Sequence, residues 1–167
     1  MTVIRGERVV LRPATEDDLG AILAMLEEPE VARWWGDYDA DRVRRDHLDD
    51  DESDTYAIEV DGRFAGVLLV YEENEADYRH AVLDISLRTE LHDRGLGREA
   101  LRAAVDHLAA QGGHHRFTID PAADNARAIR CYEAVGFRPV GVMRRYWRAP
   151  DGEWRDGLLM DLLVEDL

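Results

Sequence analysis

The 167-residue sequence has one cysteine, Cys131, and no lysine, so arginine supplies all 21 basic side chains. A lone cysteine excludes an intramolecular disulfide framework. No apolar run approaches the roughly 20 residues that span a bilayer, and the opening "MTVIRGERVV" lacks the basic start and long apolar stretch of a signal peptide. We therefore expect a cytoplasmic protein with no membrane partner.

Three common kinds of site are also missing. The six histidines show no metal-ligand spacing with the cysteine or with each other, so we expect no metal site. A dinucleotide-binding fold needs Gly-x-Gly-x-x-Gly after its first strand, and a P-loop needs Gly-Lys-Ser/Thr; the sequence has neither. Any phosphate site in this chain must therefore be built in another way.

The formal net charge of −15 narrows the possible partners. Repulsion between this charge and phosphates argues against nucleic acid, whereas a cationic molecule is attracted. Acidic side chains are densest in residues 37–54 and 72–77. The alternative is that a uniformly acidic surface serves solubility or reflects adaptation to salt, and composition leaves both interpretations open.

The fold class follows from the order of the expected elements. Thr15, with Asp18 three residues later, predicts the start of the first helix, and Asp61-Gly62 predicts a tight hairpin turn. Apolar spacing predicts strands at 7–13, 55–60, 63–73, 80–88, 116–120, 137–148 and 153–164, and helices from 15, at 29–35, 39–50, 96–110 and 124–135. This order indicates one α/β (mixed α+β) domain over residues 1–167, with a central mixed sheet and helices on both faces.

The stretch "LHDRGLGREA" (91–100) places Gly95 and Gly97 at the start of an otherwise well-formed helix. Each glycine in a helix costs roughly 1 kcal/mol relative to alanine, so the pair is a poor opening unless the backbone must approach a ligand closely. A helix N-terminus offers free N–H groups and the positive end of the helix dipole, and Arg94 and Arg98 add charge. The sequence therefore predicts an anion site here, and phosphate is the anion we expect.

Two further segments contain residues suited to chemistry. Asp84 lies among the apolar residues of strand 80–88, where a carboxylate is costly unless it is paired or used. Asn125, Ile129 and Tyr132 share one face of the later helix; Ile129 can be plain core, but Tyr132 has a phenolic proton to donate. Cys131 has no recognisable His-Asp or His-Asn partner, so we do not expect a thiol nucleophile.

Together, "HDRGLGREAL" after a mid-chain strand and "DNARAIRCYEAVGF" about 30 residues later resemble the GNAT superfamily of acetyl-CoA-dependent N-acetyltransferases. The family's Gln/Arg-x-x-Gly-x-Gly/Ala pattern falls on residues 92–97, with histidine at its first position. The resemblance extends over almost the whole chain in element order. It implies a single GNAT-like domain whose mostly antiparallel sheet is splayed at the cofactor site, in a monomer or homodimer.

The resemblance also implies roles. Asp84 would take up the proton of the acceptor amine, and Tyr132 would protonate the departing thiolate. A backbone N–H near Ser86-Leu87 would stabilise the oxyanion. Asn125 would hydrogen-bond the pantetheine arm of acetyl-CoA. The full set of cofactor-binding residues implied is Ser86, Leu87, His92, Asp93, Arg94, Gly95, Leu96, Gly97, Arg98 and Asn125.

Within the superfamily, "WWG" (34–36), "DP" (120–121), "NARAIRCYEAVGF" and "PDG" (150–152) resemble aminoglycoside 6′-N-acetyltransferases. The implied acceptor is a polycationic amino sugar, with antibiotic resistance as the role. Asp84, Asp120 and Asp151 would bind its amines, and Trp35 would either stack on a sugar ring or cover the core. The acidic segments 37–54 and 72–77 would wall the acceptor side.

Three alternatives stay open: a protein N-terminal acetyltransferase of ribosomal-protein type, a siderophore-precursor acyltransferase, and a non-catalytic acyl-CoA-binding domain. The last would have no need of Asp84 or Tyr132, so their presence favours an enzyme.

Overall fold

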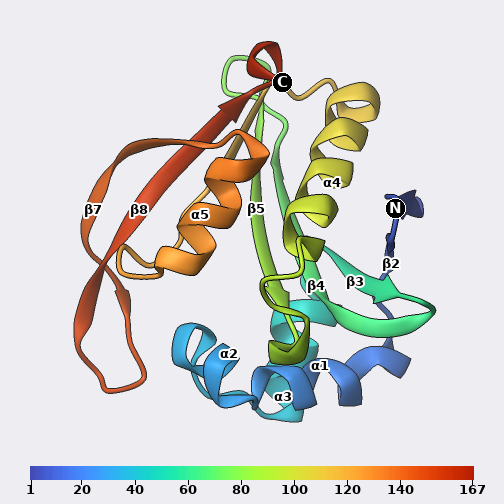
Figure 1. Ribbon diagram of the computed structural model, residues 1–167, viewed down its shortest axis with the longest axis vertical. Coiled ribbons are helices and arrows are strands. Elements are labelled where there is room, and N and C mark those ends of the chain that lie inside the picture. The colour runs from blue at the N-terminus through green and yellow to red at the C-terminus, as the bar shows by residue number, and fades with distance from the viewer.

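An eight-stranded sheet forms the centre of the computed structural model, which describes residues 1–167 (Figure 1). The strand order is β1-β2-β3-β4-β5-β6-β8-β7, and every neighbouring pair is antiparallel except β5 and β6. The strands are β1 (Ile4–Arg5), β2 (Val9–Pro13), β3 (Asp54–Val60), β4 (Arg63–Glu73), β5 (His80–Leu87), β6 (Arg116–Ile119), β7 (Arg138–Arg148) and β8 (Trp154–Leu163). The expected mixed, mostly antiparallel sheet is confirmed.

Five α-helices accompany the sheet: α1 (Leu19–Leu26), α2 (Pro29–Trp35), α3 (Ala40–Val43), α4 (Leu96–Gly112) and α5 (Ala126–Val135). A π-helical turn, Arg44–Leu48, continues α3, and α5 begins two residues later than the sequence predicted. Asp61 and Gly62 both have positive φ angles, as the expected hairpin turn requires. No helix is both long and apolar enough to cross a membrane.

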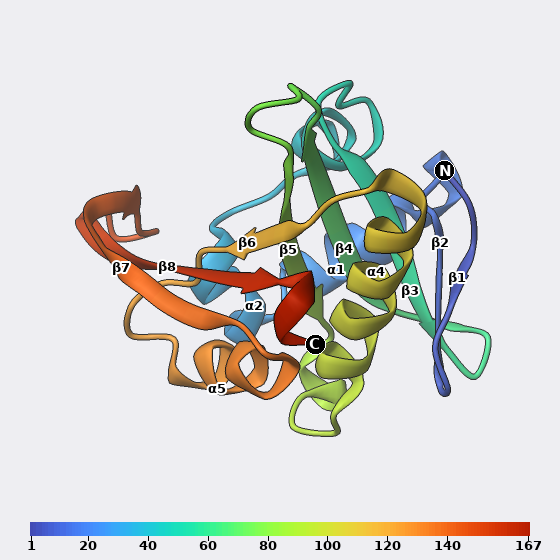
Figure 2. The same cartoon turned by 90° about the horizontal axis from the view of Figure 1, so that it is seen from above.

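The helices cover both faces of the sheet because β4 is apolar on both sides. Leu68 and Val70 face a core formed with α4 and α5, whereas Val67 and Leu69 face a second cluster formed with α1, α2 and α3. The two clusters place α4 and α5 on one face of the sheet and α1, α2 and α3 on the other, and Figure 2 shows these helices around the central strands from above. This confirms the expected helices on both faces of the sheet.

The sheet has a gap where β5 and β6 separate, and this gap connects its two faces. Only Ala81 and Val82 of β5 pair with β6, opposite Phe117 and Thr118, and the strands then diverge. The remainder of β5, including Asp84, therefore has a free edge. This splay is what the resemblance predicted for the cofactor site.

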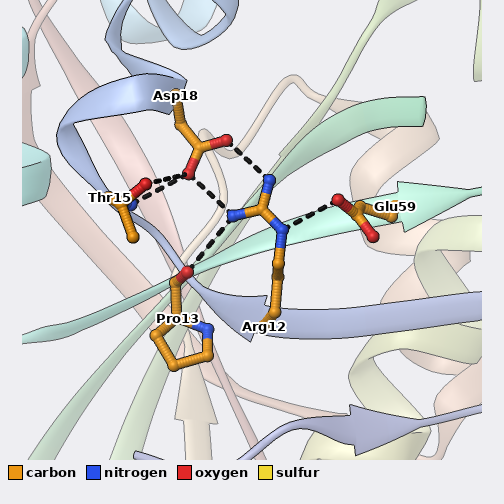
Figure 3. A network of polar contacts seen from close by, with 5 residues as sticks. All are labelled: Arg12, Pro13, Thr15, Asp18 and Glu59. Carbon is orange, nitrogen blue, oxygen red and sulfur yellow. Dashed lines mark hydrogen bonds and ion pairs between the residues drawn. The ribbon is translucent and has the colours of Figure 1, made fainter. Parts of the chain in front are cut away.

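An arginine-centred network joins the first helical turn to the sheet (Figure 3). The guanidinium of Arg12 on β2 donates two hydrogen bonds to Asp18 at 2.7 and 2.8 Å and one to Glu59 on β3 at 2.8 Å. Thr15 N–H also donates to Asp18, at 2.8 Å, which confirms the helix start read from Thr15 and Asp18. The bonds from Arg12 hold the pKa of Asp18 below its usual value although burial opposes this. The network thereby anchors the start of α1 against β2 and β3.

Candidate active site

A cleft of about 890 Å³ occupies the space that the separation of β5 and β6 creates. Its walls come from α2, the π-helical turn, β5, the start of α4, α5 and β7. The cleft brings together ten of the residues that the sequence singled out around β5, the glycine loop and α5. They are Asp84, Ser86, Leu87, His92, Asp93, Gly95, Leu96, Gly97, Arg98 and Tyr132. Asn125, Asp120 and Trp35 also line it.

One end of the cleft presents free backbone donors. Gly95 has a φ of 77° and precedes α4, and the first N–H in this region with a backbone partner is that of Glu99, which donates to the Gly95 carbonyl. The N–H groups of Gly95, Leu96, Gly97 and Arg98 have no protein partner. Four free donors at the positive end of a 17-residue helix are suited to binding an anion.

Arginines line the cleft together with these donors, but they are not the pair expected from the sequence. Arg98 lines the cleft together with Arg127 and Arg130 of α5, which sequence reasoning missed. Arg94 is exposed and does not line the cleft. The side chain of His92 donates from Nε2 to the Leu87 carbonyl at 2.8 Å and so ties the loop to β5. The positive charge at this end therefore comes from both helices.

Gly97 keeps open a space between α4, α5 and β5. A Cβ atom at this position would lie 3.5 Å from Cys131 Sγ and 3.5 Å from Leu87 Cδ1, which is ordinary van der Waals contact. Packing within the fold would therefore accept alanine at this position. The absence of a side chain matters instead because it lets a ligand come close to the Gly97 backbone. Burial raises the pKa of the Cys131 thiol, which keeps it protonated and a poor nucleophile.

Asp84 lines the cleft on the free edge of β5. Its side chain faces the cleft solvent while protein encloses its other sides, and this burial raises the pKa of Asp84 to about 7, with a contribution from the charge of Asp120. Ile85 N–H donates to Oδ1 of Asp84 at 2.9 Å, which opposes the shift. A carboxyl group with this pKa can accept and release a proton near neutral pH.

The free edge of β5 also exposes a backbone donor. Because Ile85 N–H bonds to Asp84 and not to β4, and Arg88 N–H bonds to Ala65 on the β4 side, the alternation of an antiparallel ladder turns Leu87 N–H away from β4. Leu87 lines the cleft. Its N–H therefore lies on the side where β6 has departed.

Tyr132 of α5 is almost fully buried at the cleft wall, where its ring packs edge-on against Phe137 at 6.3 Å. Burial, with the charge of Asp84, raises the pKa of Tyr132 well above its usual value, so the phenol keeps its proton. Asn125 caps α5, since its Oδ1 accepts from Ala128 N–H at 3.2 Å. Its amide nitrogen has no protein partner and is free to contact a ligand.

The opposite end of the cleft is acidic and aromatic. Its carboxylates are Glu30, Asp46, Asp50, Asp84 and Asp120, and its rings are Trp34, Trp35, Tyr38, His47, Tyr71, Tyr146 and Trp147. Trp35 is half-buried: it packs on the α1–α3 cluster and also lines the cleft. It therefore covers the core, and its stacking on a sugar ring stays a prediction. Of the acidic segment 37–54, only Asp46 and Asp50 reach the cleft, and none of 72–77 does.

His47 has no counterpart in the sequence reading. Its ring is buried between Trp35, at 5.9 Å, and Tyr38, at 5.5 Å, and burial lowers the pKa of His47 to about 4. The imidazole is therefore neutral at physiological pH. It extends the aromatic wall and adds no charge to the acidic end.

Tyr146 reaches the acidic end because β7 is irregular. A bulge at residues 143–147 shifts the register of β7 against β8, and Arg145 within it has a φ of 51°. Gly157 on the opposite strand leaves room for the ring, since a Cβ atom there would lie 2.7 Å from Tyr146 Cδ1. The nearby Asp120 carboxylate, together with burial, raises the pKa of Tyr146 to about 12.

Asp151, predicted to bind substrate, is not brought to the cleft. It lies in the turn between β7 and β8, where its carboxylate bonds to Arg155 and to Glu153 N–H. The "PDG" segment forms a turn because Gly152 adopts a φ of 86°. This part of the substrate-binding prediction is corrected.

The sequence matches the acetyltransferase (GNAT) domain family over residues 8–138. The chain belongs to this family. It is 28% identical over 166 residues to an aminoglycoside N(6′)-acetyltransferase type 1 of Klebsiella pneumoniae, covering 88% of this chain and 80% of the relative. It is 25% identical over 158 residues to the spermidine N(1)-acetyltransferase of Escherichia coli, covering 91% and 84%.

A solved structure of aminoglycoside acetyltransferase AAC(6′)-Ib in complex with coenzyme A superposes with a TM-score of 0.79. The two sequences are 26% identical, and the match covers 95% of this chain and 96% of that one. The GNAT chain described here is accordingly an acetyl-CoA-dependent acetyltransferase. The free N–H groups and arginines at one end of its cleft fit the diphosphate of that cosubstrate.

Proposed function

We propose that this GNAT enzyme acetylates a primary amine of a polycationic small molecule, with the 6′-amine of an aminoglycoside as the preferred acceptor. The supporting observation is the division of charge along one cleft. Five carboxylates with one arginine, Arg45, surround the aromatic end, and three arginines with one carboxylate, Asp93, surround the other. A cationic acceptor and an anionic acetyl donor are thus drawn to opposite ends of the same space.

Asp84 is the group that takes up the acceptor's proton. An ammonium group must lose a proton before its nitrogen can attack a thioester, and a carboxylate with a pKa of about 7 can take it at neutral pH. Asp120 stands close enough to raise that pKa further and, with its own negative charge, to hold a second amine. The acceptor is thereby bound and activated by the same pair.

Two groups complete the transfer. Acetyl-CoA supplies the activated acetyl group, and Leu87 N–H, on the free edge of β5, is the donor for the oxyanion. Tyr132 keeps its proton in its buried position and donates it to the departing sulfur. The Tyr132 hydroxyl thus acts as the acid toward the leaving sulfur, and the Asp84 carboxylate acts as the base toward the acceptor amine.

The cofactor assignment is tested at Gly97. A valine there adds an isopropyl group in the space that the phosphates approach, so the acetyl-CoA dissociation constant should rise at least tenfold, about 1.4 kcal/mol. Gly97→Ala is the matched control, because its Cβ makes only ordinary contacts and its effect should be smaller. Isothermal titration with each folded variant decides it, and a Gly97→Val protein with wild-type affinity would remove the assignment.

The acceptor class is tested by salt. The acidic end of the cleft should capture a tetracation such as kanamycin through several screened contacts, so its KM should rise about tenfold between low and roughly 0.3 M salt. A monoamine should respond only slightly. Coenzyme A release should be measured with kanamycin, a polyamine and a peptide in parallel. Asp50→Asn should flatten the salt dependence, whereas Asp77→Asn, outside the cleft, should not.

A salt-independent KM for kanamycin would mean that the acidic residues are only a solvated surface. Preference for the peptide would instead favour a protein N-terminal acetyltransferase.

A further inference from the structure

Arg8 lies directly behind the loop that opens α4, although 86 residues separate it from that loop in the chain. Its Nη1 donates a hydrogen bond to the Arg94 carbonyl at 3.1 Å. A Cβ atom on Gly95 would lie 3.4 Å from its Nη2. The guanidinium therefore supports the loop from the side facing away from the cleft, which it does not line.

The bonded carbonyl belongs to the same peptide unit as Gly95 N–H. In a planar trans peptide the C=O and N–H bonds point in opposite directions. With the carbonyl directed to Arg8, Gly95 N–H is directed away from Arg8, and Gly95 lines the cleft. This N–H is one of the four free donors of the anion site.

The loop depends on such support because its backbone is unusual. Asp93 has a φ of 58° and Gly95 a φ of 77°, so the residues on both sides of Arg94 have positive φ angles. A side-chain-bearing residue in that region is strained unless its surroundings hold it there. Without the bond from Arg8, the intervening peptide is free to rotate.

Arg8 is itself held in place by α4. Glu99, in the first turn of the helix, accepts from the side-chain Nε of Arg8 at 2.8 Å, from its backbone N–H, and from Val9 N–H at 3.1 Å. Although burial opposes it, these bonds hold the pKa of Glu99 below its usual value, so the carboxylate stays charged. The chain between β1 and β2 and the start of α4 thus form one rigid unit.

We propose that Arg8 is a positioning residue for acetyl-CoA, which orients the Gly95 N–H toward the diphosphate without touching it. The inference rests on the proposed role of the Gly95–Arg98 donors. Nothing in residues 7–13 suggested it, because that segment shows only the alternation of a strand.

The test is Arg8→Met, which keeps an unbranched side chain close to the arginine stem in shape and removes the guanidinium donors. The dissociation constant and KM for acetyl-CoA should rise about five- to tenfold. The kcat at saturating acetyl-CoA and the KM of the amine should stay within twofold, because the reacting end of the cleft is untouched. Arg8→Lys retains one donor and should recover part of the affinity.

The matched control is Arg102→Met, which removes the same charge from an exposed position on α4, where Arg102 pairs only with Asp106. It should leave acetyl-CoA binding unchanged. The salt dependence of acetyl-CoA binding separates positioning from contact. Arg8→Met should weaken binding equally at all salt concentrations, whereas a shallower slope would mean that Arg8 itself binds phosphate and would overturn the inference.

Two further results would also overturn it: unchanged acetyl-CoA affinity in Arg8→Met, or an equal loss in Arg102→Met. Failure of the underlying site is distinguishable. If Gly97→Val weakens binding and Arg8→Met does not, only the role of Arg8 is wrong. If neither weakens binding, the diphosphate site itself is wrongly placed.

Discussion

Asp84→Asn should lower kcat by about 10³-fold, the largest effect expected for any single side chain of this enzyme. The amide keeps the shape and one acceptor oxygen of the carboxylate but cannot take up a proton. The KM for acetyl-CoA should change little, because the N–H groups of Gly95–Arg98 are unaffected. Steady-state kinetics by coenzyme A release measure both constants. A variant that retains more than a tenth of the wild-type rate would contradict a role as base.

The same residue sets the expected pH dependence. Because only the ionised carboxyl is a base, wild-type kcat/KM should rise with pH and level off above a midpoint near 7, the pKa of Asp84. Asp84→Asn should lose this limb and keep a low, flatter profile. A wild-type midpoint near 4 would show that the carboxyl is not perturbed.

Stability gives the control against misfolding. The pKa of Asp84 is raised in the folded state, so between about pH 4 and pH 7 the folded protein holds a proton that the unfolded chain releases, and the contribution of this group to stability falls as the pH rises through that window. At pH 8 Asp84→Asn should therefore melt no lower than wild type. Asp151→Asn, in the β7–β8 turn, should match wild type in rate.

Tyr132→Phe should lower kcat by about 10²-fold with little change in either KM. The substitution preserves the ring that packs on Phe137 and removes only the hydroxyl, so folding should be unaffected. Tyr78→Phe is the matched control, since Tyr78 is 74% exposed and lies outside the cleft. If Tyr132→Phe turned over at the wild-type rate, the proton would have to come from water or another group.

Much of this site could be predicted because local chemistry restricts it. Two glycines at a helix start have few explanations, and Gly95 does adopt a left-handed conformation beside four free N–H groups. Asp84 stands out among apolar neighbours, and its perturbed pKa follows from that environment. The hairpin at Asp61-Gly62 likewise follows from residues that tolerate positive φ angles.

Predictions failed where an outcome depended on contacts distant in the chain. Asp151 was expected in the cleft because the "PDG" segment resembles a short motif of aminoglycoside 6′-N-acetyltransferases. In the structure Asp151 lies in the β7–β8 turn, where it forms an ion pair with Arg155. Tyr146 reaches Asp120 only through a bulge and the absence of a side chain at Gly157. Neither a bulge nor a space for a ring opposite a glycine on the neighbouring strand can be recognised from the periodicity of the sequence.

Periodicity, turn residues and the glycine pair therefore determine the order of elements, the free N–H groups at the start of α4 and the candidate acid and base, because each depends on neighbours within a few residues. The separation of β5 from β6, the clustering of Arg127 and Arg130 with Arg98, and the bond from Arg8 to the Arg94 carbonyl arise only when distant segments pack together. Strand pairing and helix packing set these contacts, and they are properties of the whole sheet rather than of any segment in it.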